Sequence, residues 1–233
     1  MKNVIVTGSL SGLGLAIKTA LVGIGCNVLE IDKGYGHNVA NPPFWLNGDN
    51  FFLGEIDGLI NCAGINQNEW FENITKEGFD RVMHTNAWSF VAMTQAVLPR
   101  LQKSAADGRN PFVINIVSNA AHIPMTSSLA YNASKAAGLM ITKQMAHELT
   151  NKYGITIFSI SPNKLSGTGM SKEIEANVCK VRGWTPEFAA EYQRKALMHG
   201  LETPPEAIAD HIANLIKSDG YKYLSGCDVP FGK

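Results

Sequence analysis

Short runs of β-branched residues alternate along the chain with longer stretches in which apolar residues recur every three or four positions. The run Val4-Ile5-Val6 is typical of a strand that is buried on both faces of a sheet. Residues 13–24 then place their apolar side chains on one side of a helix, which Gly25 ends. We therefore expect the chain to begin with a strand followed by a helix.

The same alternation continues toward the carboxyl terminus. Strands are expected at residues 27–31, 59–60, 112–117 and 155–160, and helices at 79–101, about 131–153 and 206–217. Strands that alternate with helices of this length pair in parallel, because each crossover helix returns the chain to the same end of the sheet. We predict one α/β domain over residues 1–233, a Rossmann-type doubly wound parallel sheet of about seven strands with helices on both faces.

One stretch interrupts the alternation. Residues 163–201 combine Gly167, Gly169, Gly183 and Pro186 with short helical patches, and they follow the strand expected at 155–160. In open α/β sheets, ligands bind just beyond the carboxyl ends of the strands. The sequence therefore predicts a substrate lid at about 163–201.

Composition and charge narrow the class of protein. The 20 basic and 20 acidic side chains cancel, so there is no basic excess for nucleic acid or an anionic membrane surface. No run approaches the roughly 20 apolar residues of a membrane span, and the first apolar run is too short for a signal peptide. The four cysteines and six histidines show no ligand spacing. We expect reduced thiols, no metal site and a cytoplasmic protein.

A glycine-rich segment joins the first strand to the first helix. In Thr7-Gly8-Ser9-Leu10-Ser11-Gly12-Leu13-Gly14, the three glycines permit a tight turn and the close approach of a ligand. Free N–H groups and the positive dipole at the helix start favour a pyrophosphate. The segment predicts a dinucleotide site, with a purely structural turn as the alternative. The expected cofactor contacts here are Gly8, Ser11, Gly12, Leu13 and Gly14.

Asp32 ends the second expected strand. A carboxylate at this position accepts hydrogen bonds from the adenosine ribose diol and repels a 2′-phosphate. The neighbouring Lys33 would favour that phosphate. We predict NAD as the favoured cofactor, with NADP possible.

Tyr131 and Lys135 stand four residues apart in an expected helix, so they share one of its faces. A phenol with a pKa near 10 is a poor base at neutral pH. One unit charge at about 4 Å supplies about 4 kcal/mol at an effective dielectric near 20, which lowers that pKa by about 3 units. Together with a positive nicotinamide ring, Lys135 is therefore expected to lower the pKa of Tyr131.

Several motifs occur together in one order: Thr7-Gly8-x-x-x-Gly12-x-Gly14, Asn61-Cys62-Ala63-Gly64, Asn86, Ser118 and Tyr131-x-x-x-Lys135. In order and approximate spacing the chain resembles the short-chain dehydrogenase/reductase family over essentially its whole length. The segment at 61–64 stands where that family has Asn-Asn-Ala-Gly. Several motifs in register are far more specific than any one of them.

The resemblance implies a role for each of these residues. Ser118 would hydrogen-bond the substrate oxygen, Tyr131 would give or take its proton, and Lys135 would hold the nicotinamide ribose. Asn86 would keep a water in the proton relay. Further cofactor contacts are implied for Asn61, Ala63, Gly64, Tyr131 and Lys135.

Two segments depart from the family pattern. Five residues separate Asp32 from Asn38-Val39, where the family has a helix before the Asp-Val of its adenine pocket. We expect Asn38 and Val39 to contact the adenine at a more open edge. Later, Ser161-Pro162-Asn163 replaces the family's Pro-Gly. Pro162 is expected beside the cofactor, Asn163 in a left-handed conformation, and either Ser166 or Thr168 at the nicotinamide.

The substrate side is expected to be lined by Asn66, Gln67, residues 122–125 and the lid residues Lys164, Met170 and Trp184. Trp45, Trp70 and Trp88 are expected to anchor the core or an interface.

The sequence thus predicts an NAD(P)-dependent oxidoreductase that interconverts a small secondary alcohol and a ketone, with Tyr131 as general acid/base. An NADPH-preferring carbonyl reductase and a non-catalytic dinucleotide-sensing protein on the same fold are the alternatives. The resemblance also implies a homotetramer or homodimer that packs through the helices around 86–101 and 131–153. Neither nucleic acid nor a membrane is an expected partner.

Overall fold

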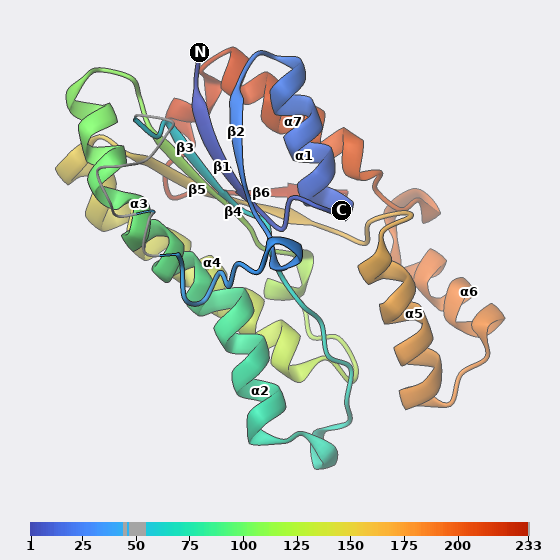
Figure 1. The fold of residues 1–233 in the computed structure, drawn as a ribbon. Coiled ribbons are helices and arrows are strands. Elements are labelled where there is room, and N and C mark those ends of the chain that lie inside the picture. Colours follow the sequence, from blue (N-terminus) through green and yellow to red (C-terminus); the bar gives the residue numbers. More distant parts are fainter. Residues whose placement is uncertain (44–45, 47–54, 233) are drawn as a thin grey trace.

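The computed structural model describes residues 1–43, 46 and 55–232. Its described part contains one parallel sheet with the strand order β2-β1-β3-β4-β5-β6 (Figure 1). The strands are β1 Asn3–Thr7, β2 Asn27–Ile31, β3 Gly58–Asn61, β4 Phe112–Ile116, β5 Thr156–Pro162 and β6 Asp228–Phe231. The predicted doubly wound parallel sheet is confirmed.

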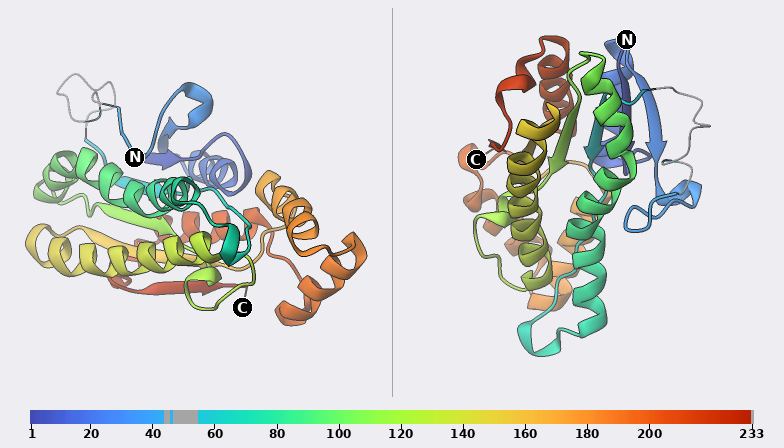
Figure 2. Two further views of the ribbon diagram at one scale, coloured as in Figure 1. Left: turned by 90° about the horizontal axis from the view of Figure 1, so that it is seen from below. Right: turned by 90° about the vertical axis from the view of Figure 1, so that its left-hand side faces the viewer.

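Helices cover both faces of this sheet. Helices α1 (Gly12–Gly23) and α7 (Pro205–Lys217) lie together on one face, and α3 (Ser89–Ala106) and α4 (Leu129–Tyr153) lie on the other (Figures 1 and 2). Helix α2 (Lys76–Met83) runs into α3 through a π-helical turn at His84–Trp88. Short 3-10 helices lie at Lys33–Tyr35, Phe71–Asn73, Asn119–Ala121, Met198–Gly200 and Gly220–Tyr223.

The core consists of two apolar layers, one on each face of the sheet. In β1, Val4 and Val6 pack toward α1 and α7, while Ile5 packs toward α3 and α4. Successive side chains of a strand point to opposite faces, so a strand that is covered twice must be apolar throughout. This requirement explains the uninterrupted β-branched runs in the sequence.

The described sheet has six strands, one fewer than the predicted number of about seven. Over residues 32–43 the chain forms a short 3-10 turn and an isolated bridge between Asn38 and Asn41, in place of the helix that the family has at this point. A crossover connection with its helix needs about ten residues or more. The five residues between Asp32 and Asn38 are too few for that helix, and in the described sheet β2 is the edge strand on this side.

Residues 163–201 form two helices, α5 (Gly169–Arg182) and α6 (Pro186–Ala196), and the turn Met198–Gly200. Both helices project from the carboxyl end of the sheet (Figures 1 and 2). A bridge between Leu165 and Thr203 closes the base of this excursion. Within the described residues, no helix combines the length and apolar character that a membrane span requires.

Candidate active site

At two positions of the glycine-rich loop at the start of α1, only glycine fits. A Cβ on Gly14 would lie 2.0 Å from the Gly8 carbonyl oxygen, and a Cβ on Gly8 would lie 3.0 Å from Cα of Ala63. Gly8 also has φ +69, a left-handed conformation that side chains disfavour. The Ser11 side chain does not cap α1, so the first N–H groups of this helix remain available to an anionic ligand. These features fit a dinucleotide pyrophosphate.

Thr7 joins this loop to the segment that follows β3. Its hydroxyl oxygen accepts hydrogen bonds from the backbone N–H groups of Cys62 (2.9 Å) and Ala63 (3.0 Å). Burial raises the pKa of the Cys62 thiol to about 12, against a smaller opposing effect of the Lys135 charge. Cys62 therefore remains a neutral thiol. Sequence analysis gave Thr7 no role of its own, although the threonine belongs to the motif.

Asn61 lies buried at the end of β3. Its amide nitrogen donates to Asn115 Oδ1 at 2.8 Å, and the Asn115 amide in turn donates to the Thr142 hydroxyl at 2.9 Å. The Asn61 amide oxygen is buried, and among the described residues it has no hydrogen-bond partner. A buried acceptor without a donor is costly. A cofactor hydroxyl or amide would supply that donor.

At the end of β2, Asp32 is 8% exposed. Its carboxylate accepts hydrogen bonds from the backbone N–H groups of Leu10 (3.1 Å) and Gly34 (2.9 Å). These bonds hold the carboxylate beside the glycine-rich loop, and each oxygen retains a lone pair for a ribose hydroxyl. Lys33 is exposed and forms no ion pair within the described part of the chain.

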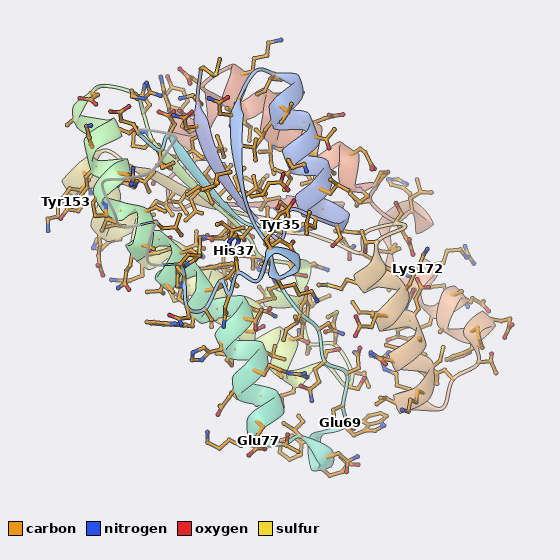
Figure 3. The ribbon with its side chains drawn as sticks, in the orientation of Figure 1. Tyr35, His37, Glu69, Glu77, Tyr153 and Lys172 are labelled. Carbon is orange, nitrogen blue, oxygen red and sulfur yellow. The ribbon has the colours of Figure 1, made fainter. Side chains whose placement is uncertain are left out.

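The predicted adenine edge is a short loop that is anchored to the helix layer. Val39 is buried among apolar residues of β1, β2 and α3, while Asn38 is exposed and uses its amide oxygen to accept the Ala40 N–H at 3.0 Å. The Trp88 indole N–H donates to the Ala40 carbonyl at 3.1 Å. Trp88 thereby ties this loop to the helix that carries Asn86, an interaction that no local sequence signal predicts. Tyr35 and His37 lie near each other before the loop, with ring centroids 6.2 Å apart (Figure 3).

Asn86 is buried within the π-helical turn between α2 and α3. Its amide donates to the Ile65 carbonyl (2.8 Å) and accepts from the Ile65 N–H (2.9 Å). The same amide nitrogen donates to the Ser134 hydroxyl at 3.0 Å, and that hydroxyl donates to the Tyr131 carbonyl at 2.8 Å. π-Helical turns are frequent at functional sites. Sequence analysis missed Ser134, although its position three residues after Tyr131 places it near that residue's face of α4.

Ser118, Tyr131 and Lys135 converge at the carboxyl end of β4. The Ser118 hydroxyl accepts the Ala120 N–H at 3.1 Å and lies near enough to the Tyr131 phenol to lower its pKa. The Lys135 ammonium lies 5.7 Å from the centroid of the Tyr131 ring and donates to the Ile116 carbonyl at 2.9 Å. Three side chains that sequence analysis assigned to one catalytic set therefore lie together.

The expected lowering of the Tyr131 pKa does not arise from the protein groups alone. Burial raises the pKa of the Tyr131 phenol, and the nearby Ser118 hydroxyl opposes this only in part. Burial also lowers the pKa of Lys135 to about 8. Both shifts have the same cause, since a poorly solvated site disfavours the charged form of either group.

Beyond β5, Thr168 is buried against the glycine-rich loop. Its side-chain atoms lie 3.5 Å from the position of a Cβ on Gly12, and its hydroxyl oxygen caps α5 by accepting the Ser171 N–H at 3.0 Å. Ser166 instead lies at the base of the 163–201 segment, where its N–H donates to the Thr203 carbonyl. Of the two candidates for the nicotinamide contact, Thr168 is thus the one that lies beside the phosphate loop.

Pro162 is the buried last residue of β5 and pairs with Phe231 of β6. The expectation of a left-handed conformation at Asn163 is wrong. Asn163 does not have positive φ, and the turn before α5 instead uses Gly167, with φ +68. The chain has placed its glycine later in the turn than the family pattern suggested.

Three of the residues expected on the substrate side make contacts with other side chains of the protein. His122 Nε2 lies 2.9 Å from Asp228 on β6. The Lys164 ammonium lies between α5 and α6, where it binds Glu175 of α5, and Trp184 stacks on Phe188 and Tyr192. Sequence periodicity could not foresee these tertiary partners. The amide of Asn66 donates to Asn68 at 2.7 Å.

The tryptophans that were expected to be anchors lie at the surface. Trp70 is 39% exposed and donates its indole N–H to the Val181 carbonyl at the end of α5 at 2.7 Å, while Trp88 is 44% exposed. Neither side chain belongs to the core, and Trp45 lies outside the described residues. Both contacts join segments that lie far apart in the sequence.

No three His, Cys, Asp or Glu side chains cluster at metal-binding distance in the described part of the structure. The four cysteines are free.

Comparisons with known proteins agree with this geometry. Sorbitol-6-phosphate 2-dehydrogenase of Klebsiella pneumoniae is 28% identical over 96% of this chain and 91% of its own length. Two solved structures share the fold: 3-ketoacyl-(acyl-carrier-protein) reductase from Brucella melitensis complexed with NADH and L-sorbose reductase from Gluconobacter frateurii complexed with NADPH and L-sorbose. Their TM-scores are 0.81 and 0.82, each at 20% identity, covering 98% and 99% of this chain and 96% and 94% of theirs.

The sequence profile of the short chain dehydrogenases matches residues 49–178, more than half of the chain. The glycine-rich loop, the Asn86 turn and the Ser118–Tyr131–Lys135 cluster lie around the same end of the sheet. The chain therefore belongs to the short chain dehydrogenase family of oxidoreductases.

Proposed function

We propose that this protein is an NAD(P)-dependent oxidoreductase that interconverts a secondary alcohol and a ketone, with NAD favoured. The observation that carries the proposal is the convergence of Ser118, Tyr131 and Lys135 beside a loop that fits a dinucleotide. The relatives named above are dehydrogenases and reductases, and two of them have been solved with NADH or NADPH.

The chain's own residues divide the work of proton transfer. The Ser118 hydroxyl hydrogen-bonds the substrate oxygen, and the Tyr131 phenol donates its proton to that oxygen during reduction or accepts it during oxidation. Lys135 binds the nicotinamide ribose and stabilises the tyrosinate by its charge. The nicotinamide supplies or accepts the hydride. Because the protein groups alone raise the pKa of Tyr131, the positive charges of Lys135 and the oxidised nicotinamide must together offset burial.

Asn86 acts through position. Its two hydrogen bonds with Ile65 and its bond to Ser134 join the loop after β3 to the helix that bears Tyr131. We assign it the family role of holding a water that returns protons from solvent to Lys135 and Tyr131. Pro162 and Thr168 would bound the cofactor on the lid side, and Asn61, Ala63 and Gly64 on the opposite side.

Asp32 supports the preference for NAD. Its buried carboxylate beside Leu10 would accept the ribose hydroxyls and repel a 2′-phosphate. Asn38 and Val39 would bound the adenine. The exposed Lys33 is the observation that favours the second candidate, an NADPH-preferring carbonyl reductase.

For the assembly, we propose a homotetramer or homodimer in the cytoplasm that packs through α3 and α4. Exposed Trp88 and Met140 on this side of the molecule support a covered surface. Light scattering at micromolar concentration should give a mass of two or four chains, and the 25.2 kDa mass of a single chain would contradict the assembly.

Titration with NADH and with NADPH, followed by nicotinamide fluorescence, tests the proposal at its first step. We expect NADH to bind more tightly. Turnover is then measured with a panel of sugar alcohols, ketoses and 3-ketoacyl thioesters. Tighter NADPH binding would favour the carbonyl reductase, binding without turnover across the panel would favour a dinucleotide sensor, and binding of neither would reject the proposal.

A further inference from the structure

Lys164 lies at the root of the lid, two residues after the end of β5. Its side chain is 17% exposed, and its ammonium contacts Glu175 of α5 and Glu202 after α6, each at 2.6 Å. It also donates to the amide oxygen of Gln193 on α6. An ammonium group has three hydrogens, so each has an acceptor, and the three acceptors come from α5, from α6 and from the segment that follows α6.

Apolar packing anchors the two lid helices only weakly. The buried residues of α5 are Ser171 and Val178, and the described part of α6 buries only Ala189. A cavity of about 410 Å³ lies between the helices, lined in part by Ala176, Ala189 and Ala190. Helices that meet across a cavity have few dispersion contacts to fix their alignment. The alignment of α5 and α6 must therefore depend more on the polar contacts of Lys164 than it would if the helices met in a packed core.

The alignment of α5 matters because both ends of this helix reach the site. At its start, Thr168 lies against Gly12 of the phosphate loop. Near its end, Arg182 donates to the Ser127 hydroxyl at 3.1 Å and to the Thr126 carbonyl, just before α4. With 14 residues, α5 is about 21 Å long at 1.5 Å per residue. A tilt of α5 at its first turn would displace the contacts at both of its ends.

We propose that Lys164 is a positioning residue that holds α5 and α6 in the closed arrangement over the substrate site. The inference rests on the proposed function, since it assigns the lid to substrate binding. Lys164 joins two carboxylates that would otherwise repel each other across the base of the lid. Loss of the cation leaves Glu175 and Glu202 facing each other without a counterion, so the lid opens while the sheet stays folded.

Limited chymotrypsin digestion of Lys164→Met, with the fragments identified by mass spectrometry, tests this directly. Trp184, Phe188 and Tyr192 are cleavage sites within the lid. We expect cleavage there to accelerate by about tenfold or more, since proteolysis follows local opening. Lys172→Met is the matched control. Lys172 lines the same cavity from α5 (Figure 3) but has no ion pair among the described residues.

Three outcomes would overturn the role of Lys164: cleavage of Lys164→Met at the wild-type rate, an equal acceleration in Lys172→Met, or an equal acceleration at sites outside the lid. The triple variant Lys164→Met with Glu175→Gln and Glu202→Gln should return cleavage toward wild type, because the repulsion is gone. If Lys164→Met does not fold, Glu202→Gln keeps the cation, removes one ion pair and gives the same test with a smaller change.

Steady-state kinetics separate positioning from general destabilisation. For a substrate found in the panel, Lys164→Met should raise KM about tenfold and change kcat less than threefold, as expected for lost uniform binding. An unchanged KM would contradict the link to substrate. Chymotrypsin cleavage does not depend on turnover, so it tests the positioning role of Lys164 even if the proposed reaction is wrong.

Discussion

The two ends of the sheet treat buried polar groups in opposite ways. At the amino end, the Asp57 side chain is 1% exposed. Its carboxylate accepts two hydrogen bonds of 2.6 Å from the Arg109 guanidinium. It also accepts hydrogen bonds from the Asn3 N–H at 2.7 Å and the Ser104 hydroxyl at 3.3 Å. This charge is buried, and its partners are all supplied by the protein.

At the carboxyl end of the sheet, the buried polar groups have fewer hydrogen-bond partners. Lys135 is 5% exposed, and the hydrogen bond described for its ammonium is the one to the Ile116 carbonyl. Burial lowers its pKa to about 8, and it raises the pKa of Tyr131. The Asn61 amide oxygen has no partner in the described structure. The fold thus supplies partners to buried polar groups at the end that serves stability, and leaves hydrogen-bonding capacity unused at the end where a ligand would bind.

The greatest loss of activity is expected from a substitution at the carboxyl end of the sheet. Tyr131→Phe removes the transferable proton but retains the ring, so kcat should fall by about a thousandfold, within the usual range for a general acid/base. The Kd for NADH, measured by fluorescence, should stay within about twofold, since the phenol is a minor part of the cofactor site. If cofactor binding is lost along with turnover, Tyr131 is a binding group and its catalytic role is wrong.

A change at the amino end should do the reverse. Asp57→Ala leaves Arg109 and the buried groups around it without their acceptor, so the free energy of unfolding in urea should fall by about 3–5 kcal/mol. Turnover per folded molecule should not change. Asp80→Ala is the control, because its ion pair with Lys76 is exposed on α2, and we expect a loss below about 1 kcal/mol. Equal losses in both variants would show that burial of Asp57 carries no special weight.

Lys135→Met tests the cost of the under-partnered cation. With a folded pKa of about 8 against about 10.5 unfolded, the unfolded chain binds more protons between these values, so wild-type stability rises with pH in this window. At pH 7 Lys135→Met should be more stable than wild type by up to about 3 kcal/mol. This advantage should shrink as the pH rises from 8 to 10.5. A constant difference in urea unfolding across that range would mean that Lys135 does not titrate there.

The smallest effect concerns the edge of the cofactor site. Asp32→Ala should weaken NADH binding by about tenfold, about 1.4 kcal/mol, and should narrow the discrimination against NADPH. Lys33→Ala is the matched control beside it and should act in the opposite direction on NADPH. An unchanged ratio of the two dissociation constants in Asp32→Ala would remove the ribose contact from the account.

The features that could be read from the sequence are those with local causes. Glycines at 8 and 14 follow from close backbone approach, and the pairing of Tyr131 with Lys135 follows from helix periodicity. The contacts that could not be read are tertiary ones. The Trp88 indole N–H donates to the Ala40 carbonyl, which lies 48 positions earlier in the chain, and nothing near Trp88 in the sequence reports this contact.

The contacts of Lys164 also depend on tertiary structure that the local sequence does not predict. Its position shortly after β5 places it at the start of the 163–201 segment, but does not show on which side of α5 its ammonium lies. That side depends on Glu202, which lies 38 positions further along the chain. Side-chain direction in such segments is decided by packing that periodicity does not encode.

Amide hydrogen exchange of the wild-type protein with and without NADH compares the two ends of the sheet most directly. We expect NADH to slow exchange at the carboxyl end, in residues 8–15, 61–65 and 131–135, and to leave the amides around Asp57 and Arg109 unchanged. Equal protection at both ends, or none at the carboxyl end at saturating NADH, would contradict the claim that this end of the sheet is left for the cofactor to complete.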